Sequence, residues 1–208
     1  MKQFSNTYIF VFSAIMVVTV AALLSVVAMQ LQPLQKKNFE INKKQNILLS
    51  VNVESSKDSA LVKYNHYITD SYVIDSEGER KEGIDPFAVN LDKELEKPVE
   101  QRNLPVFVGT VDDQKRYIIP VRGKGLWGPI WGYLSLGSDF NTIYGANFNH
   151  QSETPGLGAE IANRPFQKQF IGKKIFNEQG NFVSVDVVKG RTAPDAPHAV
   201  DGISGGTI

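Results

Sequence analysis

An uncharged, strongly apolar run over residues 8–29 constrains this chain more than any other feature. A helix needs about 20 apolar residues to cross the hydrocarbon core of a bilayer, and this run is long enough. A signal peptide has a shorter apolar region that is followed by a small-residue cleavage site. This run is longer than such a region, and no clear cleavage site follows it. Tyr8, Phe10 and Phe12 gather at one end, as aromatic residues do at membrane interfaces. The sequence therefore predicts a single uncleaved transmembrane anchor, with a buried helix of a soluble protein as the alternative.

The residues after the anchor predict a stalk and then one domain. Apolar residues recur among lysines and asparagines over residues 34–49, which is typical of a helix leading away from a membrane. We therefore predict an anchor over residues 1–30, a helical stalk over 31–50 and a single domain over 51–208. The domain length is ordinary for one hydrophobic core.

Short segments rich in β-branched and aromatic residues dominate the second half of the chain. Strands are predicted there at residues 106–111, 116–121, 131–136, 142–148 and 182–188, and one earlier strand is predicted at residues 71–75. Asp112 and Asp113 suit a hairpin turn, and Pro120 indicates a sheet edge or a strand end. Helices are predicted near residues 61–67, 92–97 and 157–162. Hairpins with inserted helices favour an α+β domain, with an antiparallel-rich sheet and packed helices, over a Rossmann sheet.

The composition excludes several classes of function. The chain has 22 basic and 22 acidic residues, a formal net charge of zero, so no bulk charge favours nucleic acid. It has no cysteine, which excludes disulfides, thiol nucleophiles and iron–sulfur ligation by this chain. Three histidines without a serine hydrolase signature give hydrolytic catalysis little support. We predict no catalytic residues.

Glycine and aromatic residues are concentrated over residues 123–133, with the sequence GKGLWGPIWGY. Such a segment suits a backbone that closes around a planar ligand, with an aromatic ring available for stacking. Leu126 and Trp127 are the predicted contacts, and Lys124 is placed near a phosphate or an anionic ring. A β-hairpin whose aromatic residues fill the core is the alternative.

A second unusual segment, residues 150–160, follows a predicted strand and enters a predicted helix. Its N–H groups and the Thr154 hydroxyl would face a ligand at a helix start. His150 and Glu153 are possible metal ligands, but with no third candidate nearby we predict no metal site.

The last eight residues, DGISGGTI, form a short acidic run in which two hydroxyls stand beside glycine. Glycine lets a backbone approach a flat or anionic ligand closely. If the run opens a helix, its free N–H groups favour a phosphate near Thr207. A flexible tail is the alternative. Only Ile208 follows Thr207, and one helical turn is not stable alone, so we expect the true C-terminus to lie further on.

Taken together, GKGLWGPIWGYLSL, ETPGLGAEI and DGISGGT behind one N-terminal span resemble the family of C-type subunits of sodium-translocating NADH:quinone oxidoreductases. That family carries an FMN-binding domain with a flavinylation motif. The resemblance covers the anchor and roughly residues 104–208, and Gly206 departs from the alanine that is more usual there. The related G-type subunit of the Rnf complex shares the last two segments but generally lacks the first, and it stays an alternative. The second alternative is a membrane-tethered extracytoplasmic binding module without flavin.

The resemblance implies an electron carrier with FMN joined through a phosphoester to Thr207. Besides Thr207, the predicted cofactor contacts, including those named in the paragraphs above, are Asp201, Ser204, Gly205, Gly206, Thr154, Gly156, Leu157, Gly158, Leu126, Trp127 and Lys124. It also implies electron flow from NADH to quinone coupled to sodium export. The implied partners are the other members of a six-subunit membrane complex and a flavin transferase.

Two arguments disagree about the side of the membrane on which the domain lies. Four lysines close behind the span, Lys36, Lys37, Lys43 and Lys44, would keep the domain in the cytoplasm by the positive-inside rule. The family resemblance implies a single-pass protein of the bacterial inner membrane with a periplasmic domain. We follow the resemblance, because long domains translocate largely regardless of nearby charge.

Overall fold

The computed structural model describes residues 5–193 and 196–205. The chain divides into two compact units, residues 1–42 and 43–208. The helices are α1 (Asn6–Ser50), α2 (Ala60–Tyr67), α3 (Leu91–Leu95) and α4 (Arg164–Lys168), with 3-10 helices η1 (Val99–Gln101) and η2 (Gly158–Ala162). The strands are β1 (Ile68–Ile74), β2 (Arg80–Lys81), β3 (Leu104–Val111), β4 (Gln114–Lys124), β5 (Pro129–Leu136), β6 (Ile143–His150), β7 (Asp186–Val188) and β8 (Ala199–Asp201).

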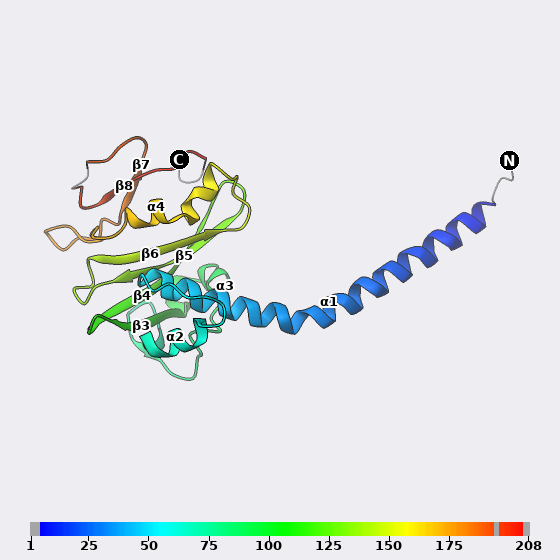
Figure 1. The fold of residues 1–208 in the computed structure, drawn as a ribbon, viewed down its shortest axis with the longest axis horizontal. Coiled ribbons are helices and arrows are strands. Elements are labelled where there is room, and N and C mark those ends of the chain that lie inside the picture. Colours follow the sequence, from blue (N-terminus) through cyan, green and yellow to red (C-terminus); the bar gives the residue numbers. More distant parts are fainter. Residues whose placement is uncertain (1–4, 194–195, 206–208) are drawn as a thin grey trace. The chain divides into compact units, whose positions relative to one another are not determined.

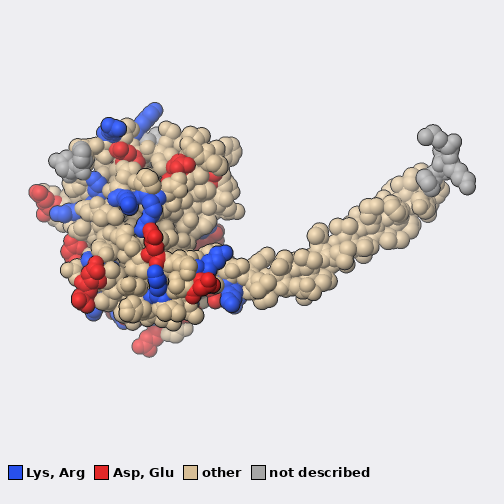
Figure 2. Space-filling view, in the orientation of Figure 1, with Lys and Arg blue, Asp and Glu red and all other residues tan. Residues whose placement is uncertain are grey.

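Helix α1 contains the apolar run and continues through Pro33 into the globular unit. By length and composition it is able to cross a membrane. Figure 2 shows no acidic or basic side chains along its apolar part, whereas charges of both signs are interspersed on the visible face of the globular unit. The predicted boundary at residue 30 has no counterpart in the helix, which is continuous to Ser50. The boundaries of anchor, stalk and domain stay predictions.

A six-stranded sheet forms the centre of the globular unit, with the strand order β2-β1-β3-β4-β5-β6 (Figure 1). Every neighbouring pair in this sheet is antiparallel. The predicted α+β class with an antiparallel-rich sheet is therefore confirmed. The hairpin turn at Asp112 and Asp113 is also confirmed, and both residues have positive φ angles, of 51° and 58°.

Pro120 lies inside β4 at a place where the strand has one neighbour. The pairing of β3 with β4 reaches only as far as Phe107 and Ile118. Beyond that pair, β4 continues against β5 alone, and Pro120 pairs with Tyr133. Since proline has no N–H to donate, it is tolerated where one side of the strand is unpaired. The predicted edge is therefore a local edge of an otherwise central strand.

The strand predicted over residues 182–188 is largely wrong. Only β7 (Asp186–Val188) is a strand, and it pairs in parallel with β8 in a separate two-stranded sheet. Ser184 has a positive φ of 61°, which interrupts the extended backbone. Phe182 instead makes an isolated bridge to Phe176. The apolar, β-branched composition of the segment comes from packing rather than from membership of the main sheet.

Two hydrophobic clusters lie against opposite faces of the sheet, because neighbouring residues of β5 belong to different clusters. Tyr133 belongs to the first, with Ile47 and Val51 from the end of α1 and the segment after it. Leu134 packs against the second, which contains Phe166 and Phe170 from α4 and its C-terminal side. The second cluster also contains Val200 of β8, so it places the C-terminal segment beside α4.

Candidate functional site

The three glycine-rich segments of the sequence meet around the side chain of Glu153. This side chain belongs to the second segment, and Glu153 is only 4% exposed. Its Oε1 accepts a hydrogen bond of 2.9 Å from the backbone N–H of Trp127, which belongs to the first segment. The carboxylate thus fixes one loop against the other, although the two residues are far apart in the chain.

Two glycines make this close approach possible. A Cβ atom on Gly125 would lie 2.3 Å from Glu153 Oε1. A Cβ atom on Gly158 would lie 2.6 Å from Glu153 Oε2 and 2.6 Å from the carbonyl oxygen of Gly205. Real Cβ atoms do not approach other atoms so closely, so both positions require glycine. Because Gly205 belongs to the third segment, Gly158 is the point at which the second and third segments touch.

The ETPGLG segment forms a compact turn. The carbonyl of Thr154 accepts hydrogen bonds from the N–H groups of Leu157 and Ala159, each at 3.1 Å. Gly156 has a φ of 75°, a conformation that glycine adopts without strain. The turn leads into η2 (Gly158–Ala162), so the helix predicted over residues 157–162 is a five-residue 3-10 helix. The Thr154 side chain is exposed at the start of this turn.

Uncovered apolar side chains stand beside this junction. Leu126, Trp127 and Leu157 are 67%, 66% and 47% exposed. A hydrogen bond of 2.8 Å from the Gly125 N–H to the Gly128 carbonyl closes the loop that carries the first two. Trp127 therefore does not fill the core, whereas Tyr133 of the same segment does, so the hairpin alternative holds for Tyr133 and not for Trp127.

Lys124 lies at the end of β4 and is exposed. It lines a shallow hollow together with Asp92, Leu95 and Arg122, and the Arg122 guanidinium pairs with Asp92 at 2.6 Å. The contacts of the junction described above do not include the Lys124 side chain. Its role toward a phosphate or ring stays a prediction.

The third segment is fixed where it leaves β8. The Asp201 carboxylate accepts hydrogen bonds from the N–H and the hydroxyl of Thr192, at 2.6 and 2.8 Å, and these bonds lower its pKa below the ordinary aspartate value. The Asp201 N–H donates to Gln169 Oε1 at 2.8 Å. Asp201 thus orients the segment. Ser204 is exposed and Gly205 has a φ of 72°.

Gly206 and Thr207 lie outside the described residues. The predicted roles of Asp201, Ser204, Gly205, Gly206 and Thr207 toward a cofactor stay predictions.

The sequence left His150 and Glu153 as possible metal ligands. In the structure, their contact is a hydrogen bond between the His150 ring and the Glu153 backbone. His150 Nδ1 accepts the backbone N–H of Glu153 at 3.2 Å, so the ring caps the turn. The Glu153 carboxylate is directed to Trp127 instead. Glu153 is the residue that sequence reasoning missed as a partner of the first segment. An acidic residue directly before Thr-Pro-Gly was the only signal, and it does not reveal a partner in a distant loop.

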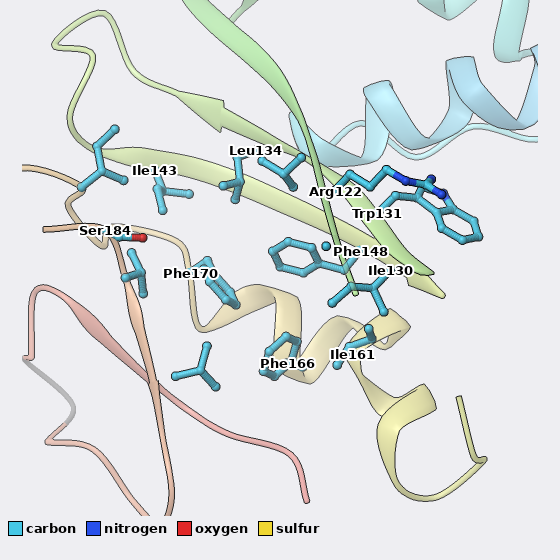
Figure 3. Close-up of a pocket in the computed structure, with 15 residues that line it drawn as sticks. Arg122, Ile130, Trp131, Leu134, Ile143, Phe148, Ile161, Phe166, Phe170 and Ser184 are labelled. Carbon is cyan, nitrogen blue, oxygen red and sulfur yellow. The ribbon is translucent and has the colours of Figure 1, made fainter. Parts of the chain in front are cut away.

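A separate cavity of about 290 Å³ lies between the sheet and α4 (Figure 3). Phe148, Phe166 and Phe170 line it, with Ile130 and Ile161, and Arg122 and Trp131 lie at one end. Of the predicted cofactor contacts that the structure describes, none lines this cavity. Its lining is mainly apolar, and this cavity is distinct from the junction at Glu153.

Comparison with known proteins agrees with this picture. The model of the FMN-binding domain family matches residues 125–208, which include all three glycine-rich segments from Gly125 onward. The C-type subunit of the Na(+)-translocating NADH-quinone reductase from Vibrio vulnificus is 30% identical over 202 residues, covering 89% of this chain and 79% of that protein. The corresponding protein from Vibrio parahaemolyticus is 28% identical over 207 residues, with the same coverage.

Solved structures extend the comparison to the fold. The crystal structure of the same reductase subunit from Parabacteroides distasonis has 49% sequence identity and a TM-score of 0.77, and the match covers 86% of each chain. The NqrC structure from Shewanella oneidensis, at 23% identity and a TM-score of 0.70, shares the fold; the match covers 82% of this chain and 86% of that one. The chain therefore belongs to the NqrC family, the C-type subunits of the Na(+)-translocating NADH-quinone reductase.

Proposed function

We propose that this chain carries electrons within a Na(+)-translocating NADH-quinone reductase through an FMN joined covalently to Thr207. Family membership supports the electron-carrying role and the FMN domain. The observation that carries the finer proposal is the junction at Glu153. There, loops that hold Trp127, Gly158 and Gly205 converge immediately before the predicted attachment residue.

The residues present fit a flavin. Gly125 and Gly158 let the Glu153 carboxylate and the Gly205 backbone approach where any Cβ would collide, so the three segments stand close together at one place. The exposed side chains of Leu126, Trp127 and Leu157 offer apolar surface for the faces of a ring system. FMN supplies the ability to accept and release electrons, while the protein supplies placement and electrostatics.

The residues of this chain have separate tasks in the proposal. Thr154 and the turn formed by Gly156, Leu157 and Gly158 orient the ring, and Leu126 and Trp127 shield it from water. Asp201, held by Thr192, directs the chain toward the attachment point. Ser204, Gly205 and Gly206 shape the backbone around the phosphate, and Lys124 balances nearby negative charge. No residue of this chain is assigned a substrate of its own.

The experiment that tests this function is the intact mass of the chain purified from native membranes. We expect a mass increase equal to one FMN phosphoester and a fluorescent band on a denaturing gel, because only a covalent bond survives denaturation. A colourless band with an unmodified mass would favour the binding module without flavin. Fluorescence together with co-purifying Rnf proteins would favour the Rnf alternative.

We also propose the partners and location that the family resemblance implies. The chain joins five other subunits, is modified by a flavin transferase and carries its domain on the periplasmic side of the inner membrane. Helix α1 is long and apolar enough to be the single span. A reporter enzyme that works only outside the cytoplasm, fused after Val188, is expected to be active. Activity of a cytoplasm-only reporter at the same position would support the lysine distribution instead.

A further inference from the structure

The Glu153 carboxylate is buried with only one of its oxygens satisfied. Oε1 accepts the Trp127 N–H, whereas Oε2 has no hydrogen-bond partner among the described residues. Buried acceptors in native proteins are almost always paired, and leaving one unpaired costs about 1–3 kcal/mol, more when it is charged. A residue that bears such a cost is a candidate for a role in the site.

Among residues 5–193 and 196–205, no donor to Oε2 removes this cost. The place where a Gly158 Cβ would stand is 2.6 Å from Oε2 and equally close to the Gly205 carbonyl oxygen. A carbonyl oxygen accepts hydrogen bonds and cannot donate one. Oε2 is therefore held where the second and third glycine-rich segments touch.

The carboxylate also determines the spacing of the loops. It lies between Gly125 on one side and Gly158 on the other, and both approaches are closer than a side chain permits. If Glu153 were shortened, the Trp127 N–H would lose its acceptor and the two loops would lose the group that separates them. The same residue thus sets both the geometry and the charge of the junction.

We propose that Glu153 is a positioning residue of the flavin site that also sets its redox potential through a buried negative charge. This inference rests on the proposed function. The carboxylate keeps the Trp127 loop at a fixed distance from the Gly156–Gly158 turn and holds a charge beside the ring. A nearby negative charge opposes the addition of electrons. Removing the charge while keeping the shape makes the flavin easier to reduce.

The test uses the full-length, detergent-solubilised chain and two variants. Glu153→Gln keeps the size and an oxygen for the Trp127 N–H but removes the charge. Glu153→Ala removes both the oxygen and the spacing. Glu178→Gln, at an exposed position in a remote turn, is the control for loss of a carboxylate. Covalent flavin is measured by in-gel fluorescence, folding by thermal melting, and the midpoint potential by spectroelectrochemical titration.

We expect Glu153→Gln to retain flavin and to shift the ratio of reduced to oxidised flavin at least tenfold toward reduced. For a one-electron couple this is about 59 mV in the positive direction. Glu153→Ala is expected to change the flavin absorption spectrum as well, because the ring loses its fixed neighbours. Glu178→Gln is expected to match the wild type.

An unchanged potential in Glu153→Gln would overturn the role of the charge, and an unchanged spectrum in a folded Glu153→Ala would overturn the positioning role. If Glu153→Ala does not fold, Glu153→Gln alone decides. Wild-type protein without covalent flavin would instead overturn the proposed function itself, and this inference with it. The two failures are therefore distinguishable.

Discussion

A Thr207→Ala chain is expected to lose its covalent flavin completely. The phosphoester requires a hydroxyl at the acceptor position, and alanine has none. The structure supports this assignment through position: Gly205, two residues before Thr207, touches the turn that contains Gly158. The in-gel flavin fluorescence of membranes that express the variant is the measurement, and the expected signal is zero against a full signal from the wild type.

Two further variants make the result specific to the hydroxyl at residue 207. Thr207→Ser restores a hydroxyl and is expected to restore part of the fluorescence. Ser204→Ala removes the other hydroxyl of the motif, which is exposed, and is expected to weaken attachment only partly. Peptide mass mapping that places the flavin on Ser204, or flavin retained by Thr207→Ala, would contradict the assignment.

Gly158→Ala is expected to separate the second and third glycine-rich segments. The added methyl group would lie 2.6 Å from both Glu153 Oε2 and the Gly205 carbonyl oxygen. Neither is the free end of an exposed side chain, since one belongs to a buried carboxylate and the other to the backbone. Overpacking of this kind costs about 1–3 kcal/mol of unfolding free energy. We expect that loss together with a several-fold drop in flavin attachment.

Gly123→Ala is the matched control for this substitution. A Cβ atom there would meet Ile130 side-chain atoms at 3.5 and 3.6 Å, which are ordinary contacts. We expect stability and flavin content close to the wild type. Denaturant unfolding followed by tryptophan fluorescence, with in-gel flavin fluorescence on the same samples, compares the two variants. Equal behaviour of Gly158→Ala and Gly123→Ala would show that the segments need not touch for attachment.

Local features of the fold could be predicted from the sequence because they depend on residues close together in the chain. The apolar run over residues 8–29, the turn at Asp112 and Asp113 and five of the six predicted strands follow from composition, periodicity and turn chemistry. The strand over residues 182–188 could not be predicted correctly. Its apolar residues pack against α4 and β8, and periodicity does not distinguish that packing from a sheet.

The candidate site likewise has features that the sequence predicts and features that it does not. Its three segments could be recognised from the sequence, because glycine clusters beside hydroxyl and aromatic residues are visible in a linear pattern. The exposure of Trp127 and the contact of Gly158 with Gly205 could not, because each depends on which loops the sheet brings together. Glu153 is the clearest case, since it follows β6 while its partner Trp127 lies in the loop between β4 and β5.

Residue order and residue type were therefore sufficient to predict the long apolar helix, the antiparallel character of the domain and the three glycine-rich segments. Each depends on local periodicity or on residue type, which the chain order preserves. The tertiary structure alone decided that these segments meet at one buried carboxylate, and that Pro120 stands at a local edge of a central strand. Both depend on strand register and on contacts between distant residues, which are fixed only when the whole sheet has formed.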